Sequence, residues 1–121
     1  MKGEKAYKAV TKVDNRLISF FVCGKAMLEY KPGEVTKAHD WTLREGFGIF
    51  CFGNLYAARR WIKPWSDFAQ IWEVEGVGRM KVPEFMADQE ALSEGSVRLV
   101  PIRNMPGTVM YKAVRLLKRM V

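Results

Sequence analysis

The sequence predicts a single α+β domain over residues 1–121, in which an antiparallel sheet, formed by a meander plus C-terminal strands, packs with one or two short helices. Three observations indicate this class. The chain has 121 residues, 49% of them hydrophobic, which suits one core rather than two. Short β-prone runs are joined by tight turns, as in antiparallel meanders. One segment, Leu55–Ile62, has the apolar spacing of a helix.

The N-terminal part is expected to form the meander. Apolar and polar residues roughly alternate before Asp14-Asn15, and a β-branched and aromatic run follows this turn. Gly24-Lys25 supplies a second turn, and Pro32-Gly33 ends the third strand, because Pro fixes φ and Gly permits positive φ. The expected strands are Ala6–Val13, Leu17–Cys23 and Ala26–Tyr30.

The middle of the chain is expected to form a loop, a strand and a helix. Val35–Gly46 has no sustained period, so we expect a loop with room for one helical turn, forming a pocket wall. Phe47–Phe52 is a dense apolar strand. Asn54 is the expected cap of the helix Leu55–Ile62, and Lys63-Pro64 should end it, because Pro disfavours helical geometry in the residue before it.

The C-terminal part returns to strands. Gln70–Val77 alternates, as expected of a strand with one more solvent-exposed face. Pro83–Gly95 is interpreted as a lid, in which Glu84–Leu92 forms either a short helix or part of an ordered excursion over the sheet. The next strand is Val97–Ile102. Thr108–Met120 is β-branched enough for a long final strand, although a helix from Tyr111 is the alternative.

A short echo links the two ends of the chain. Tyr7-Lys8-Ala9-Val10 near the start resembles Tyr111-Lys112-Ala113-Val114 near the end. Two such similar segments suit neighbouring strands, which would bring the termini together.

Composition points to an anionic partner. Lys and Arg outnumber Asp and Glu by 20 to 13, which gives a net charge of +7. Four Trp, seven Phe and four Tyr exceed what one small core easily covers, so part of this aromatic surface is expected at an interface or in a pocket. No run of residues approaches the ~20 apolar positions that span a bilayer, so a cytoplasmic protein without membrane contact is expected.

Metal, cofactor and catalytic motifs are absent from the sequence. Cys23 and Cys51 lie in apolar stretches without CxxC spacing and are expected to be buried thiols. His39 is expected to be a solvated loop histidine rather than a general base, although Asp40 follows it. Neither a nucleophile elbow nor a phosphate loop occurs, so we expect no enzyme, no cofactor and no bound metal.

Arginines interleaved with aromatic residues supply candidate binding groups. Guanidinium groups form bidentate hydrogen bonds with phosphate, aromatic rings stack on bases, and Asn can hydrogen-bond a base edge or a ribose hydroxyl. Arg103-Asn104 falls between two apolar strands, where loops commonly present binding groups. The candidate ligand-binding residues are Phe85, Arg103, Asn104, Arg16, Arg59 and Arg60.

Short motifs spread over most of the chain carry a family resemblance. They are an opening Tyr-Lys-x-Val (Tyr7–Val10), a Leu-x-Ser strand (Leu17–Ser19) and a Tyr-x-x-Gly-Glu turn (Tyr30–Glu34). Further along come a Gly-Ile-Phe-x-Phe strand before an Ala-Arg helix (Gly48–Arg59), a Glu-Val-Glu strand (Glu73–Glu75) and a closing Pro-Gly-Thr-Val (Pro106–Val109). With these motifs the chain resembles small bacteriophage proteins that include the anti-Thoeris sponges, which sequester cyclic ADP-ribose signals made by bacterial defence enzymes.

The resemblance implies a function and a set of roles. It implies a cytoplasmic anti-defence protein of the infected bacterial host, a homodimer or higher homo-oligomer, which holds a cyclic ADP-ribose-type signal without cleaving it. Phe85 and Arg103 would stack on adenine, Asn104 would make a polar base or ribose contact, and Arg16, Arg59 and Arg60 would bind the phosphates. Higher assemblies of the family imply further sites for cyclic oligonucleotides.

Two other functions remain open at the level of sequence. A basic phage nucleic-acid-binding protein would use the same Arg, Lys and aromatic residues, with strongly salt-dependent affinity. An ADP-ribosyltransferase-like enzyme would need a catalytic carboxylate near its pocket, for which Glu73, Glu75 and Glu90 are the candidates.

Overall fold

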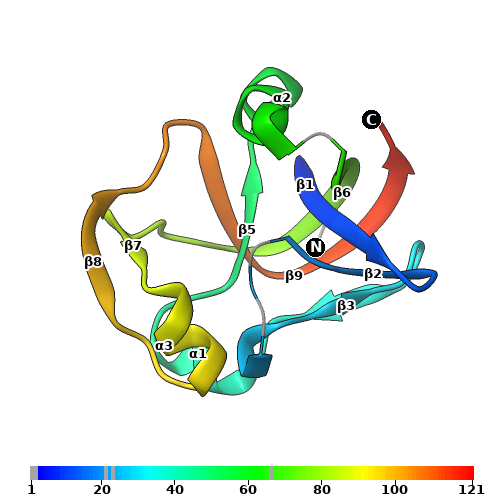
Figure 1. Cartoon of the computed structure of the whole chain (residues 1–121). Helices are drawn as coiled ribbons and strands as arrows, with labels where there is room; N and C mark the ends of the chain where they lie inside the picture. Colours follow the sequence, from blue (N-terminus) through cyan, green and yellow to red (C-terminus); the bar gives the residue numbers. More distant parts are fainter. Residues whose placement is uncertain (1–2, 21, 23, 66) are drawn as a thin grey trace.

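A computed structural model describes residues 3–20, 22, 24–65 and 67–121, and shows the expected α+β class (Figure 1). Its strand pairs are all antiparallel. The strands are β1 (Glu4–Val13), β2 (Arg16–Ser19), β3 (Glu29–Tyr30), β4 (Val35–Lys37), β5 (Ile49–Phe52), β6 (Ala69–Met80), β7 (Phe85–Ala87), β8 (Leu99–Arg103) and β9 (Thr108–Arg119). The helices are α1 (Asp40–Arg44), α2 (Leu55–Ile62) and α3 (Gln89–Glu94), with 3₁₀ turns at η1 (Gly24–Ala26) and η2 (Lys63–Trp65).

The main sheet closes into a small ring. β6 pairs with β1 on one side and with β9 on the other, and β5 joins the far edges of β1 and β9 through Tyr7–Phe52 and Ile49–Tyr111. β2 and β4 extend the same far edges of β1 and β9, respectively. β7 and β8 form a separate two-stranded ribbon, which lies beside the ring (Figure 1). The ring encloses an interior that side chains from β1, β5, β6 and β9 fill.

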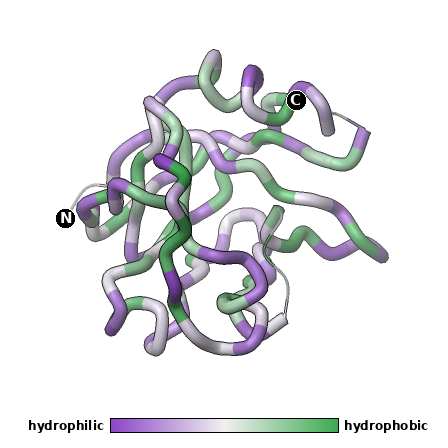
Figure 2. The backbone as a smooth tube through the Cα atoms, turned by 60° about the vertical axis from the view of Figure 1, so that its left-hand side comes forward, coloured by the Kyte–Doolittle hydropathy of each residue, from purple (hydrophilic) through white to green (hydrophobic). Residues whose placement is uncertain are grey.

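Among the residues that the structure describes, three clusters of buried side chains form the core. The largest lies inside the ring and includes Val10 from β1, Val74 from β6 and Leu116 from β9. The second lies beneath α2, where Ala58 and Ile62 pack against the sheet. The third joins η1, α1 and α3 to the side of the ring, through Ala26 and neighbouring apolar residues. Hydrophobic and hydrophilic stretches follow one another along most of the backbone (Figure 2), whereas the short strands β5 and β7 contain apolar residues throughout.

The predicted hairpin and helix are confirmed. β1 and β2 pair across Asp14 and Asn15, whose positive φ values of 49° and 65° are those of a tight hairpin turn. α2 spans the predicted residues, and the Asn54 side chain accepts a hydrogen bond of 2.7 Å from the Ala57 amide. The expected reason for the helix end is wrong, because Lys63 keeps helical dihedrals and continues into η2. Pro at the second position of a 3₁₀ turn tolerates this geometry.

The expected strands Leu17–Cys23 and Ala26–Tyr30 are too long. β2 ends at Ser19, and Phe21 and Cys23 lie outside the described residues, so the expectation of a buried Cys23 stays a prediction. Residues Gly24–Ala26 form η1, closed by a hydrogen bond from Met27 N to Gly24 O, and β3 keeps two residues. Packing of η1 against α3 overrides the local β propensity.

The expected loop Val35–Gly46 holds the helical turn α1 but also a strand. β4 pairs with residues 113–115 of β9, and Val35 is exposed, so its stability comes from backbone pairing and not from an apolar pattern. The expectation of a helix over Glu84–Leu92 is wrong, because residues 85–87 form β7 and the helix α3 begins only at Gln89. Asp88 caps the N-terminus of α3 by accepting a hydrogen bond from Glu90 N, which starts the helix later. The described residues form three short α-helices, one more than the one or two expected.

The C-terminal segment is the long strand β9, not a helix. The echoed segments Tyr7–Val10 and Tyr111–Val114 are not neighbours as expected, because β5 on one side and β6 on the other separate β1 from β9. They occupy equivalent positions across the ring, each paired with β6. The echo therefore marks two strands with the same two neighbours.

Candidate functional site

A cavity of about 580 Å³ lies between the ring, the third core cluster and the ribbon. A volume of this size is typical of small-molecule sites. Its wall is mostly apolar and strongly aromatic, as expected from the surplus of aromatic residues. The aromatic wall residues are Phe20, Tyr30, Phe47, Phe50, Phe52, Trp61 and Trp65, besides His39. The exposed side chain of Gln89 in α3 also lines it, so the cavity reaches the surface beside that helix.

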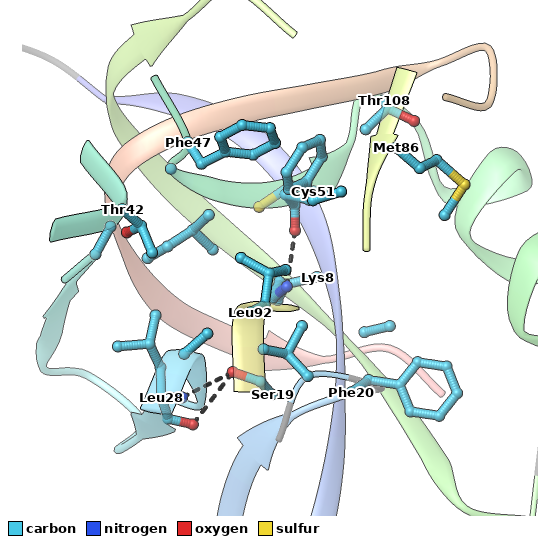
Figure 3. A pocket seen from close by; sticks show the side chains of 18 of the residues that line it. Lys8, Ser19, Phe20, Leu28, Thr42, Phe47, Cys51, Met86, Leu92 and Thr108 are labelled. Atoms are coloured by element: carbon cyan, nitrogen blue, oxygen red, sulfur yellow. Dashed lines mark hydrogen bonds between the residues drawn. The ribbon is translucent and has the colours of Figure 1, made fainter. Parts of the chain in front are cut away.

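One lysine side chain lies on this wall. Lys8 shares a face of β1 with the buried residues Ala6 and Val10, so the pleat of a central strand directs a charged group toward the core. Its ammonium donates a hydrogen bond of 2.8 Å to the Phe50 carbonyl oxygen (Figure 3). It also lies 5.9 Å from the centre of the Tyr30 ring. A lysine at a core-facing position breaks the usual pattern of strands, and such breaks mark functional positions.

The surroundings of Lys8 disfavour charge. Burial lowers the pKa of its amine and raises the pKa of the neighbouring Cys51 thiol to about 11, so Cys51 is a protonated, unreactive thiol at neutral pH. Cys51 is 1% exposed, which confirms the expected buried thiol at this position. Among the described residues, no Asp or Glu lines the cavity. The Lys8 ammonium therefore has a backbone carbonyl, and no carboxylate, as its described partner.

The Lys8 amine should make stability depend on pH in the alkaline range. With a lowered pKa, the folded protein binds fewer protons than the unfolded chain up to the ordinary lysine pKa of ~10.4. The Lys8 contribution to the stability of the wild type therefore rises with pH through this window. Lys8→Met removes the titrating group, so its stability advantage over the wild type should shrink as the pH rises. Denaturant unfolding at stepped pH measures this difference.

The control for this prediction is Lys12→Met, which alters an exposed lysine on the same strand and should show no such trend. The other titratable groups facing Lys8 are Tyr30 from β3 and Cys51 from β5, and His39 lines the same cavity. All of them are present in all three proteins. The Lys8 charge lowers the pKa of the Cys51 thiol, so the difference between Lys8→Met and the wild type reports Lys8 together with this coupling. A pH-independent difference between Lys8→Met and the wild type would contradict the lowered pKa.

His39 is not the solvated loop histidine that was expected. Its ring is half-buried, lines the cavity and makes a contact of 2.9 Å from Nε2 to the Met27 carbonyl oxygen. Because a carbonyl only accepts, Nε2 carries the proton in this contact. The ring also stacks on Trp41 at 6.3 Å. His39 thus ties the segment before α1 to the chain after η1, on the wall of the cavity.

The ribbon brings three of the predicted ligand-binding residues together. Phe85 in β7 and Arg103 in β8 are direct partners in the strand register. The Arg103 guanidinium carbon lies 5.9 Å from the centre of the Phe85 ring, and Arg103 Nη1 lies 3.1 Å from Glu84 Oε1. The ring is half-buried and the guanidinium is exposed. A flat aromatic surface and a cation thus stand side by side next to the cavity.

Asn104 connects this pair to the cavity. Its Nδ2 donates to the carbonyl oxygens of Pro83 at 2.7 Å and Phe85 at 3.1 Å, which fixes the side chain. Asn104 lines the cavity, and within the described part of the chain its Oδ1 accepts no hydrogen bond. An oriented amide oxygen is therefore available to a donor group of a ligand.

The other three predicted residues lie elsewhere. Arg16 begins β2 and pairs with Glu29 at 3.0 Å, on the wall of a shallower groove of about 370 Å³ that also holds Lys12, Lys31, Arg119 and Trp72. Arg59 and Arg60 are exposed on α2 and line neither the cavity nor this groove. α2, β2 and the ribbon occupy three separate regions (Figure 1). The six residues therefore do not form one pocket within a single chain.

The carboxylates considered for an enzyme are engaged in surface contacts. Glu73 pairs with Lys5 at 3.0 Å, and Glu75 pairs with Arg115 at 3.1 Å. Glu90 is exposed in the first turn of α3. As noted above, the described cavity wall holds no carboxylate, so none of the three faces the cavity.

Sequence reasoning missed Lys8 and His39 as cavity residues. The signal for Lys8 was present, because strict alternation along β1 assigns it to the same face as Ala6 and Val10. His39 gave no such signal, because its segment has no period. Nothing in the described part of the chain groups three or more His, Cys, Asp or Glu side chains as a metal site.

None of the family models, curated proteins or solved structures compared with this chain matches it. The longest helix, α2, has eight residues, and within the described ranges no helix has the length and apolar character to cross a membrane.

Proposed function

We propose that the protein binds and sequesters a cyclic ADP-ribose-type signal without cleaving it, as a phage anti-defence protein. The observation that carries this proposal is the pairing of Phe85 with Arg103 beside the fixed Asn104 amide. The resemblance to anti-Thoeris sponges supports the same function.

The ribbon offers complementary contacts to an adenine ring. The base would stack on Phe85 and against the Arg103 guanidinium, and its exocyclic amine would donate to Asn104 Oδ1. Stacking of a base on an aromatic side chain contributes ~1–3 kcal/mol. Glu84 holds the Arg103 side chain near the ring before the ligand arrives, which lowers the entropic cost of binding.

The phosphates need cations that one chain does not place at the ribbon. Arg16, Arg59 and Arg60 lie in other regions of the fold, so they would reach a ligand at the ribbon from a second subunit. A homo-oligomer is therefore part of the proposal. Substitution of these arginines should weaken binding only in an assembled protein, and a monomer that binds fully would remove them from the site.

Arg103→Ala should lower the affinity for a cyclic ADP-ribose isomer by about 1–3 kcal/mol, the scale of a lost charge-assisted contact. Calorimetric titration of the wild type and the variant measures this change, and chromatography of ligand released by heat shows whether it is intact. Arg79→Ala is the matched control, because Arg79 is another exposed arginine with a glutamate partner, at 3.4 Å.

The outcomes separate the possibilities. Tight binding with intact ligand recovered, weakened by Arg103→Ala and not by Arg79→Ala, supports sequestration at the ribbon. Unchanged affinity in folded Arg103→Ala removes Arg103 from the site. Conversion of the ligand, or turnover of a nicotinamide dinucleotide, would replace sequestration by an enzymatic function.

The groove around Arg16 favours a second candidate function, binding of single-stranded nucleic acid. Its wall holds four basic side chains, Lys12, Arg16, Lys31 and Arg119, together with the half-buried ring of Trp72. A basic groove with an aromatic platform is the usual arrangement for such ligands. Fluorescence anisotropy with labelled oligonucleotides tests it, and affinity that falls steeply with salt and disappears in Lys12→Met/Arg119→Ala would move this function to first place.

A further inference from the structure

The wall of the cavity behind the ribbon differs in chemistry from the nucleotide site proposed at the ribbon. Its wall presents one ammonium group, that of Lys8, and among the described residues it contains no arginine and no second lysine. A pyrophosphate carries two negative charges and needs several donors. The interior of the cavity therefore does not suit the phosphates of the proposed nucleotide.

The cavity does suit a single negative charge on an apolar body. Lys8 Nζ has three hydrogens, and within the described part of the chain one of them is donated, to the Phe50 carbonyl oxygen at 2.8 Å. Apolar and aromatic side chains, among them Leu28, Phe47 and Leu92, surround the remaining space (Figure 3). An ammonium group in such surroundings is stabilised most by a fixed anion.

We propose that this cavity binds a small monocarboxylic acid, with the carboxylate paired to the Lys8 ammonium and the hydrocarbon or aromatic body between the apolar side chains. The Ser19 hydroxyl is engaged with the Leu28 backbone, since it accepts from Leu28 N at 2.9 Å and donates to Leu28 O at 3.4 Å. Phe85 and Arg103 do not line the cavity, and Asn104 lies where the two sites adjoin, so the Lys8 site goes beyond the nucleotide proposal.

The ion pair would be strong for a physical reason. Charge-assisted hydrogen bonds in a water-poor site exceed neutral ones, and ligand binding restores the charged state that burial disfavours in Lys8. The ligand enters beside α3, where exposed Gln89 lines the cavity. The neutral alcohol of equal length would keep the apolar contacts and lose the ion pair.

The test compares decanoate with decanol. Calorimetric titration and the fluorescence of Trp61 and Trp65, which line the cavity, report binding of each probe. The wild type should bind one decanoate per chain, about 10- to 100-fold more tightly than decanol, the ratio expected for a charge-assisted hydrogen bond. Lys8→Met should lose this preference while still binding decanol, because Met has about the length of the apolar lysine stem but carries no ammonium group.

The Lys8→Met variant is expected to remain folded, so a loss of the preference for decanoate would reflect the missing ammonium group. Replacement of a half-buried charge that has no described carboxylate partner by an apolar side chain of similar size is usually neutral or stabilising, so the variant should unfold at or above the wild-type midpoint. Lys12→Met, on the same strand but exposed, should bind decanoate as the wild type does.

Three results would overturn the proposal. They are equal affinity of the wild type for decanoate and decanol, retention of the preference in Lys8→Met, and loss of it in Lys12→Met, which would indicate adsorption to the basic surface. Arg103→Ala distinguishes the two sites, because it should impair nucleotide binding and leave decanoate binding unchanged. Failure of one proposal therefore leaves the other standing.

Discussion

Leu116→Ala should lower the free energy of unfolding by about 2–5 kcal/mol, the range for truncation of a buried leucine. Leu116 is 1% exposed and belongs to the cluster inside the ring, beside Val10 and Val74. The truncation leaves a void that β1, β6 and β9 cannot collapse to fill, because they are held by hydrogen bonds on both sides. Urea unfolding followed by far-UV circular dichroism measures the change.

The adjacent Leu117 provides the control. It lies in the same strand and has the same chemistry, but it is 46% exposed. Leu117→Ala should change stability by no more than about 0.5 kcal/mol. A larger loss in Leu117→Ala than in Leu116→Ala would mean that the faces of β9 are assigned incorrectly, since a shift of one residue exchanges inside and outside.

Gly76→Ala should destabilise the fold by roughly 3 kcal/mol, at the upper end of overpacking effects. A Cβ at this position would lie 2.5 Å from Cδ2 and Cε2 of the Tyr111 ring, which is itself 2% exposed. The ring cannot retreat, because the core surrounds it and Tyr111 Oη is hydrogen-bonded to Glu4 at 3.0 Å. Thermal unfolding should show a lower midpoint for this variant.

Gly53→Ala separates the steric cause from a general cost of replacing glycine. A Cβ at Gly53 would have its nearest neighbour at 3.6 Å, which is an ordinary contact, so little change is expected. In a double-mutant cycle, Tyr111→Leu should reduce the cost of Gly76→Ala, because the smaller side chain removes the clash. Additive losses would contradict the contact between Gly76 and the ring.

Much of the fold was predictable where a local signal was strong. The Asp14-Asn15 turn and the Asn54 cap depend on neighbouring residues alone, so the β1–β2 hairpin and α2 followed from the sequence. β4 and β7 did not, because their three-residue strands exist through pairing with β9 and β8, which are distant in sequence. Ring closure depends likewise on the single pair Tyr7–Phe52 between β1 and β5, which no local pattern encodes.

The candidate site was predictable in part. Phe85, Arg103 and Asn104 were selected by residue type, and the structure places them together because β7 and β8 pair in that register. Arg16, Arg59 and Arg60 were selected by the same reasoning and lie apart, since residue type carries no information on distance. The cavity could not be predicted, because its wall is formed by side chains from most elements of the fold and their proximity depends on tertiary structure.

The closed ring also limits how copies of this chain can associate. Long strands with a free edge recruit other strands and promote aggregation. Here the ends of the main sheet are β3 and β4, with two and three residues, and Pro101 leaves β8, in the ribbon, without one backbone donor. Continuous sheets across a subunit boundary are therefore disfavoured. Any contact between copies of this chain should therefore use side-chain surfaces, such as exposed Leu99 and Ile102, and not paired strand edges.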